Sequence, residues 1–317
     1  NDDRWRYWLA QADLKFGQAE PGALQELAKK ANYYGFLAAD ELGLTYNICP
    51  EQPEIDHSDV ERVAADAGLQ RALELRKAEL HDWAIGEWSS AASRFPTADL
   101  RAIASLARRE SWDDRVIFAL GNSGDRRFYD WRFPLLWEEE IKREAAANRL
   151  DPAWVYGTIR SESAMVETAR SSANALGLMQ VTPATGKRVA KKHGLPWSGI
   201  AQLKTVAGNL PVGTAYMGDL LQEFRQNPVL VSGSYNAGPR AVDRWLEDRP
   251  LVDAPIWIET LPYYETRDYI PRVLAFTTIY DWRLGGKVTR ISARMPHIES
   301  GKIAVGGYTE VVCRDES

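Results

Sequence analysis

The sequence has few cysteines and few histidines. Two cysteines, Cys49 and Cys313, and four histidines occur among its 317 residues. So few cysteines exclude a scaffold built on disulfides, and no Cys/His spacing is that of a zinc site. We interpret the two thiols as unrelated; a bridge between them is the alternative, which an oxidising compartment would favour. No metal or organic cofactor is expected.

The chain also lacks the features of nucleic-acid-binding and membrane-spanning proteins. Its formal net charge is −5, whereas phosphate binding needs a basic face. No apolar run approaches the roughly 18 residues that span a bilayer. No basic, apolar and small-residue signal pattern opens the chain, so we expect no signal peptide within it. Neither nucleic acid nor stable membrane insertion is expected.

Helical patterns dominate the sequence, so the fold class is expected to be mainly all-α. Apolar residues recur at spacings of three and four. The first half contains such segments around 4–16, 22–31, 33–42, 59–79, 81–94, 97–109 and 112–122. Alanines among the larger apolar residues allow close helix packing, which indicates an α-solenoid. A polar linker is expected over 46–59, and an extended tail or hairpin after Gly285-Gly286.

A carboxylate lies on an apolar helix stripe in the second half of the chain. Asp151-Pro152 is a helix start signal, and the helix is expected to run through AWVYGTIRSESAM. Helical spacing places four residues on one stripe: Val155, Ile159, Glu162 and Val166. Burial disfavours the charged form of a carboxyl group and raises its pKa, as a general acid near neutral pH requires. The alternative is a structural glutamate that pairs with an arginine or a helix N-terminus.

The surroundings of Glu162 are expected to keep its pKa high. Arg160, two positions away, points to another side of the helix and should not pair with it. Met179 is expected to add to the desolvation of the acid. Tyr235 and Gln180 are expected to offer hydrogen bonds without charge.

Three further motifs follow Glu162. They are GLMQVTP at 177–183, SYNAGP at 234–239 and ETRDYIPRV at 265–273. Taken singly, each has a structural interpretation: a loop between helices, a helix break with a core tyrosine, and a capping cluster at a helix start. Taken in order with the ES pair at 162–163, they closely resemble the soluble lytic murein transglycosylases of Gram-negative bacteria.

The resemblance implies a domain organisation. Residues 1–57 resemble the end of that family's superhelical U-type domain, and 58–132 its helical linker domain. Residues 133–287 would then form a lysozyme-like, α-rich catalytic domain, and 288–317 a C-terminal tail.

The resemblance also implies an activity and a site. The enzyme would cleave the MurNAc–GlcNAc β-1,4 bond of peptidoglycan and form 1,6-anhydro ends, with Glu162 as its single acid/base. The substrate-binding residues that it implies are Ser171, Met179, Gln180, Tyr235, Asn236, Glu265 and Tyr269. It implies glycan strands with peptide stems as the substrate, cell-wall synthesis or remodelling proteins as candidate partners, and the periplasm as the location.

Two other functions stay open on the sequence alone. A goose-type lysozyme-like hydrolase would need a second carboxylate to activate water, for which Glu167, Asp219 and Glu223 are the candidates. A non-catalytic glycan-binding helical module would be favoured by loss of the catalytic glutamate, which is present here. The product of the reaction would separate the three possibilities.

Overall fold

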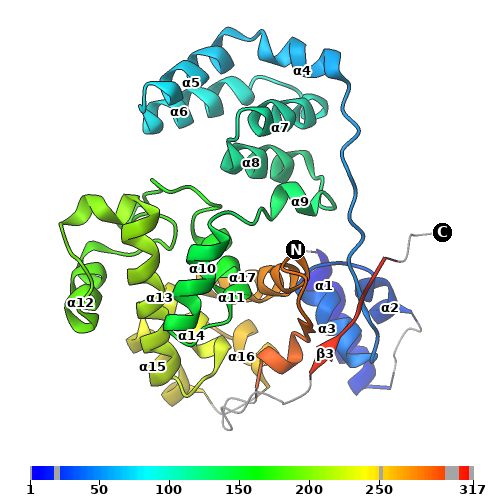
Figure 1. The fold of residues 1–317 in the computed structure, drawn as a ribbon. Helices are drawn as coiled ribbons and strands as arrows, with labels where there is room; N and C mark the ends of the chain where they lie inside the picture. Colours follow the sequence, from blue (N-terminus) through cyan, green and yellow to red (C-terminus); the bar gives the residue numbers. More distant parts are fainter. Residues whose placement is uncertain (1, 18–21, 250–252, 297–306, 314–317) are drawn as a thin grey trace.

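The computed structural model of the chain consists almost entirely of α-helices, which confirms the predicted fold class. It describes residues 2–17, 22–249, 253–296 and 307–313. These form seventeen α-helices, three 3₁₀ helices and four two-residue strands. None of the helices in these ranges is long and apolar enough to cross a membrane. Figure 1 shows an arch of helices above a larger helical body.

Three helices open the chain and pack onto the body. They are α1 (Asp2–Lys15), α2 (Ala23–Ala28) and α3 (Tyr33–Glu41). The Tyr34 hydroxyl donates a hydrogen bond of 2.8 Å to Glu259, far along the chain. Buried side chains of these helices belong to the same hydrophobic cluster as those of the body. The beginning and the second half of the chain therefore share one core.

The arch has a hydrophobic core of its own. It comprises α4 (His57–Ala64), α5 (Ala67–Lys77), α6 (His81–Ala92), the 3₁₀ helix η1 (Thr97–Asp99), α7 (Leu100–Arg109) and α8 (Asp113–Ser123), with α9 (Tyr129–Arg132) leading on to the body. Trp88 is buried in this core, with its ring 5.1 Å from that of Trp112. The single helix expected over 59–79 is instead two, because Asp66 accepts the N–H groups of Gly68 and Leu69 and caps α5.

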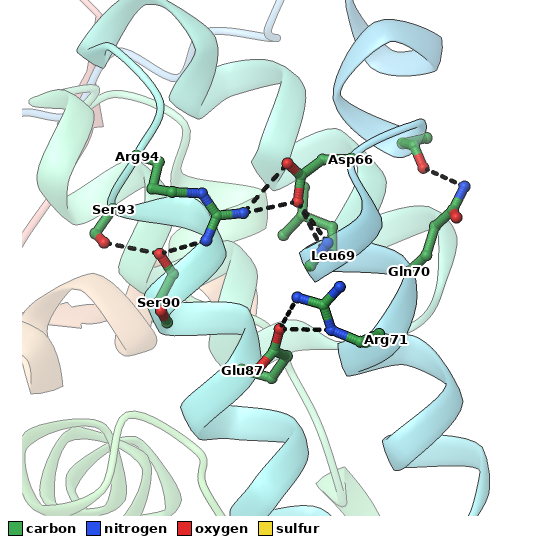
Figure 2. A network of polar contacts seen from close by, with 10 residues as sticks. Asp66, Leu69, Gln70, Arg71, Glu87, Ser90, Ser93 and Arg94 are labelled. Carbon is green, nitrogen blue, oxygen red and sulfur yellow. Dashed lines mark hydrogen bonds and ion pairs between the residues drawn. The ribbon is translucent and has the colours of Figure 1, made fainter.

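Charged side chains pair between the α5 and α6 segments of the arch (Figure 2). Arg71 lies 2.6 Å from Glu87, and Arg94 lies 3.1 Å from Asp66. Both arginines are largely exposed, so each pair contributes only about 0–1 kcal/mol. The stability of the arch therefore comes mainly from its apolar core.

The body is organised around two helices that cross closely. Its helices are α10 (Glu138–Ala147), α11 (Pro152–Glu162), α12 (Pro183–His193), η2 (Ile200–Lys204), α13 (Val206–Glu223), α14 (Pro228–Ala237), α15 (Pro239–Asp248), α16 (Ala254–Glu259) and α17 (Tyr264–Arg283). A Cβ at Gly157 of α11 would lie 2.6 Å from the Thr277 hydroxyl of α17. Only a glycine at position 157 therefore lets α11 and α17 approach each other this closely. The Tyr156 and Tyr280 rings stack beside it at 4.7 Å. The crossing fixes where α11 ends relative to α17.

The end of the chain returns to its beginning. Strand β2 (Val288–Thr289) pairs antiparallel with β3 (Tyr308–Thr309), and β4 (Val311–Val312) pairs parallel with β1 (Tyr46–Asn47); the 3₁₀ helix η3 (Ser292–Arg294) lies between β2 and β3. Cys49 and Cys313 form a disulfide with their Cα atoms 4.5 Å apart. The interpretation of two unrelated thiols is therefore wrong. Residues 297–306 and 314–317 of the expected tail lie outside the described residues.

A network of ion pairs connects this tail to the start of α11. The Arg294 guanidinium lies 2.9 Å from Asp151 and 2.7 Å from Asp281. Burial raises the pKa of Asp281 to about 6, although the charge of Arg294 opposes the rise. Asp151 is the N-cap of α11, so the tail holds the start of that helix in place.

Candidate active site

Glu162 is the last residue of α11. The helix begins at the predicted cap, where Asp151 accepts a 2.9 Å hydrogen bond from the N–H of Ala153. It ends earlier than expected, because Ala164 and Met165 adopt φ angles of 50° and 71° and leave the helical conformation. Glu162 therefore stands at a helix end, beside a loop.

The apolar stripe beneath Glu162 is shorter than predicted. Val155 and Ile159 are fully buried on α11, as expected. Val166 lies beyond the end of the helix and is not part of the stripe. The spacing rule failed there because it assumes that the helix continues.

Burial of Glu162 raises its pKa from 4.5 to about 7. The Tyr269 hydroxyl donates a 2.5 Å hydrogen bond to its Oε1 and lowers the pKa, as does the charge of Arg272, while the charge of Glu265 raises it. The C-terminal end of a helix also disfavours a negative charge. Glu162 can therefore both hold and release a proton near neutral pH.

The neighbouring arginine does not pair with this acid. Arg160 donates a 2.9 Å hydrogen bond to the Arg132 carbonyl, and its guanidinium lies 5.1 Å from the centre of the Phe276 ring. This agrees with the prediction that Arg160 points to another side of the helix. The hydrogen-bond partner of Glu162 among the described residues is the Tyr269 hydroxyl.

The hydrogen bonds that Tyr235 and Gln180 were expected to offer the acid go to backbone carbonyls. Tyr235 donates to the Met179 carbonyl at 2.7 Å, and the Gln180 amide donates to the Gly177 carbonyl at 2.9 Å. The Met179 side chain is fully buried. The expectation that Tyr235 and Gln180 donate hydrogen bonds to Glu162 is therefore wrong. The hydroxyl of Tyr269 donates to Glu162 instead.

A buried amide that sequence analysis missed holds the GLMQ loop. The Asn209 side chain donates to the carbonyls of Leu176 and Leu203, both at 2.8 Å, and accepts the Met179 N–H at 2.8 Å. Asn209 is fully buried on α13. Its signal in the sequence is a lone amide within the apolar run VAGNLPVGTAYM, which suggests a buried hydrogen-bonding role.

The third and fourth motifs meet at the junction of α14 and α17. The Asn236 amide donates to Glu265 at 3.2 Å, and its oxygen accepts the Thr266 hydroxyl at 2.7 Å. Glu265 is exposed, whereas Thr266 is buried. The two motifs, 26 residues or more apart in the sequence, thus form one polar cluster near Glu162.

An open cavity of about 740 Å³ lies against Glu162. Among the sequence-predicted site residues, Ser171 and Gln180 line it together with Glu162. The other predicted residues do not: Met179, Tyr235, Asn236, Glu265 and Tyr269. The opposite wall belongs to the arch, which sequence analysis did not connect with the site; its residues are Asp82, Ile85, Arg115 and Phe118.

None of the candidate second carboxylates lines this cavity. Asp219 lies 2.8 Å from Lys192 and 2.9 Å from His193, and Glu223 is exposed. Glu167 is exposed between two residues that do line the cavity, Val166 and Thr168. Within the described ranges, no three His, Cys, Asp or Glu side chains gather where they could hold a metal ion. Among the described residues, the carboxyl groups that line the cavity are those of Glu162 and Asp82.

The fold and the site define a class of protein. It is a mainly helical chain with a superhelical first part and a lysozyme-like α-rich domain, which carries a partly buried carboxylic acid beside an open cavity. Family models match three segments: the transglycosylase SLT domain at 139–255, the soluble lytic murein transglycosylase L domain at 62–125, and the soluble lytic transglycosylase helical domain at 260–288.

Comparison with individual proteins confirms the predicted resemblance to the soluble lytic murein transglycosylases. The soluble lytic murein transglycosylase of Escherichia coli K12 is 30% identical over 297 residues, which are 92% of this chain and 45% of the relative. The structure of an inactive Glu→Gln variant of lytic transglycosylase Slt from Pseudomonas aeruginosa is 34% identical with a TM-score of 0.86, covering 91% of this chain and 47% of that one.

A second solved structure supports the same conclusion. The 70 kDa soluble lytic transglycosylase of Escherichia coli is 28% identical with a TM-score of 0.82, covering 95% of this chain and 48% of that one. The chain spans less than half the length of each of these relatives.

Proposed function

We propose that the chain is a lytic transglycosylase that cleaves the MurNAc–GlcNAc β-1,4 bond of peptidoglycan and leaves a 1,6-anhydro end. The observation that carries the proposal is Glu162, a partly buried acid with a pKa of about 7 at the edge of a cavity of about 740 Å³. The named relatives support it, because they are lytic transglycosylases. One of them is inactive when a glutamate is replaced by glutamine.

Glu162 acts twice in this reaction. As an acid, it donates its proton to the glycosidic oxygen while the bond from that oxygen to the muramic C1 breaks. As a carboxylate, it then takes the proton of the muramic C6 hydroxyl, whose oxygen forms the new bond to C1. The proton count returns to its starting value, so one carboxyl group suffices and no water is consumed. A pKa near neutral suits both steps.

The positive charge that develops at the muramic C1 between the two steps must be stabilised. We assign this role to the substrate's own N-acetyl group, as in the substrate-assisted exceptions to the two-carboxylate rule. The described carboxylates support this assignment, because Asp82 on the arch is the only other one that lines the cavity. An N-acetyl oxygen that attacks from within the substrate needs no second protein nucleophile.

The predicted substrate residues divide into two groups under this proposal. Ser171 and Gln180 line the cavity; Ser171 offers its hydroxyl to the sugar, and Gln180 offers its amide oxygen, since its amide nitrogen donates to the carbonyls of Ala169 and Gly177. Tyr269 acts on the proton affinity of Glu162. Tyr235 supports the loop that carries Gln180.

The remaining predicted residues, Met179, Asn236 and Glu265, do not line the cavity. Met179 anchors the loop through its buried side chain and its backbone hydrogen bonds. Asn236 and the exposed Glu265 form a polar cluster that could meet a peptide stem. We therefore keep Asn236 and Glu265 as proposed substrate contacts and Met179 as a support.

We also propose the domain division 1–57, 58–132, 133–287 and 288–317, with the periplasm as the location. The separate core of the arch supports the second unit. The disulfide between Cys49 and Cys313 supports an oxidising compartment. Peptidoglycan, the proposed substrate, is found in such a compartment in Gram-negative bacteria.

The test is a mass spectrum of the fragments that the purified protein releases from sacculi. Anhydro ends are expected, and they are lighter than hydrolysed ends by one water. Hydrolysed ends would instead indicate a goose-type lysozyme-like hydrolase. Binding without any release would indicate a non-catalytic glycan-binding module.

A further inference from the structure

The two sulfur atoms of the bridge between Cys49 and Cys313 lie in different surroundings. Cys313 is an exposed residue, whereas Cys49 is only 7% exposed. A thiolate that cleaves a disulfide must reach one of its sulfur atoms, and the other sulfur then leaves as a thiolate. Exposure therefore makes Cys313 the sulfur that is attacked and Cys49 the sulfur that leaves.

A cavity of about 850 Å³ lies against Cys49. Its walls come from the first helices of the chain, the end of the arch and α17, and Glu162 does not line it. Two carboxyl groups of the described lining, those of Asp2 and Asp3, stand against five basic residues, namely Lys29, Lys30, Arg126, Arg127 and Arg132. Lys30 and Asp3 lie 2.5 Å apart and offset each other, which leaves an excess of basic residues around the cavity.

Two of these arginines bring positive charge to the side of the bridge that carries Cys49. The Nε of Arg127 donates a 3.1 Å hydrogen bond to the Cys49 carbonyl. The same guanidinium lies 2.9 Å from Glu51 in a half-exposed pair, which solvent screens. The Nε of Arg132 is buried and has no hydrogen-bond partner among the described residues. Because nearby positive charge stabilises a thiolate, the arginines favour the departure of Cys49.

The outer part of the tail depends on the bridge. The N–H groups of Tyr46 and Ile48 donate hydrogen bonds of 3.0 Å to the carbonyls of Glu310 and Val312. The pairings of β4 with β1 and of β3 with β2 each cover only two residues. Strand pairings this short are marginal in water by themselves. The bridge therefore supplies much of the restraint on residues 307–313.

The inner part of the tail is held without the bridge. The N–H of Ile291 donates to the Tyr46 hydroxyl at 2.6 Å, and the N–H of Ser292 donates to Asp40 at 2.9 Å. The Arg290 guanidinium also lies 2.7 Å from Asp40. None of these contacts involves a sulfur atom. Cleavage of the bridge would therefore free the outer strand and leave the inner tail on the body.

We propose that the Cys49–Cys313 bridge is a thiol-exchange site at which a dithiol reductant releases β4 from β1 and leaves the inner tail in place. A thiolate of the reductant attacks Sγ of Cys313 to form a mixed disulfide, and Cys49 leaves as a thiolate. The second thiolate of the reductant then attacks the reductant's own sulfur in the mixed disulfide, which releases Cys313. The reductant is oxidised to a disulfide, and its two protons end on Cys49 and Cys313.

A monothiol identifies the sulfur that is attacked, because it cannot complete the second step within one molecule. The folded, oxidised protein is incubated with glutathione in the absence of denaturant, and free thiols are trapped with iodoacetamide. Mass spectra of its peptides should show glutathione on Cys313 and the alkyl group on Cys49.

Hydrogen exchange measures which part of the tail is released. Dithiothreitol, a dithiol, should reduce the bridge of the folded protein. Exchange should then become roughly tenfold faster at the amides of Tyr46 and Ile48, because each loses a hydrogen-bond acceptor on the outer strand. The amides of Ile291 and Ser292 should keep their protection, since their acceptors lie outside that strand.

The role of the charge is tested at Arg127. Arg127→Gln should slow the reaction with glutathione roughly two- to threefold, as expected for one solvent-screened charge near the leaving sulfur. Arg127→Lys, which keeps the charge, should restore most of the rate. Arg244→Gln, at an exposed position on α15, is the matched control and should leave the rate unchanged.

Three outcomes would overturn the inference. They are a bridge that resists dithiothreitol until urea is added, glutathione found on Cys49 in place of Cys313, and loss of protection at Ile291 together with Tyr46. Equal rates for the wild type and Arg127→Gln would refute the role of the charge. None of these measurements uses the turnover of Glu162, so their failure and the failure of the proposed function are independent.

Discussion

Replacing the acid should stabilise the protein while it abolishes turnover. In Glu162→Gln the side chain keeps its size but cannot ionise or donate an acidic proton. Loss of an acid/base typically costs roughly 10²–10⁴-fold in rate. The opposite effect on stability follows from the raised pKa of Glu162, since a buried carboxyl group that must ionise destabilises the folded state.

The sign and size of this effect follow from proton binding. The pKa of Glu162 is about 7 in the folded protein and close to 4.5 when the chain is unfolded. Between these values the folded state binds the extra proton, so the free energy of unfolding falls as pH rises. The full loss, reached above pH 7, is at most about 3–4 kcal/mol, because each unit of the pKa difference costs about 1.4 kcal/mol. The amide of the Glu162→Gln variant cannot ionise, so the variant escapes this loss.

Urea unfolding of both proteins at pH 5 and at pH 8.5 measures the difference. Glu162→Gln should be close to the wild type at pH 5 and more stable at pH 8.5, with no release of fragments from sacculi at either pH. Glu223→Gln, at an exposed position on α13, is the matched control. An equal stability difference at the two pH values would refute the reasoning, and so would turnover by the variant at the wild-type rate.

Three other changes probe the surroundings of the acid and the end of the chain. Wild-type activity should fall above about pH 7, where Glu162 loses its proton. Tyr269→Phe should move this fall upward by about one to two pH units, because ionised Glu162 then lacks a charge-assisted hydrogen bond. An unmoved pH profile would contradict this. Tyr235→Phe leaves the Met179 carbonyl without its hydrogen-bond donor, so it should lower the free energy of unfolding by about 1–3 kcal/mol. The folded variant should keep most of its activity. A loss of turnover at an unchanged Tm would instead place the Tyr235 hydroxyl in the reaction. Cys313→Ser should lower the free energy of unfolding by up to about 5 kcal/mol, and an unchanged Tm would show that the bridge is not formed in solution.

The parts of the fold that the sequence predicts well are those with local signals. The start of α11 depends on Asp151 and Pro152, and both are found where they were expected. The helical fold class follows from apolar spacings that repeat along most of the chain. The four ordered motifs located the region of the acid because their resemblance to a known family preserves order and distance.

The features that were missed depend on contacts between distant residues or on single backbone angles. The end of α11 at Glu162 rests on two positive φ angles, for which Ala164 and Met165 give no sign in the sequence. Cys49 and Cys313 are 264 residues apart, so their pairing appears only in the folded chain. The approach of Arg115 to the cavity likewise depends on how the arch sits above the body.

The bond between Cys49 and Cys313 has a consequence for how the molecule would survive damage. It closes nearly the whole chain, with both α11 and α17, into one covalent ring. A protease that cut one peptide bond anywhere between those two cysteines would open the ring without releasing a fragment. The nicked molecule would still migrate as one species unless it was reduced, and the helices on either side of the cut would remain tethered at a high local concentration.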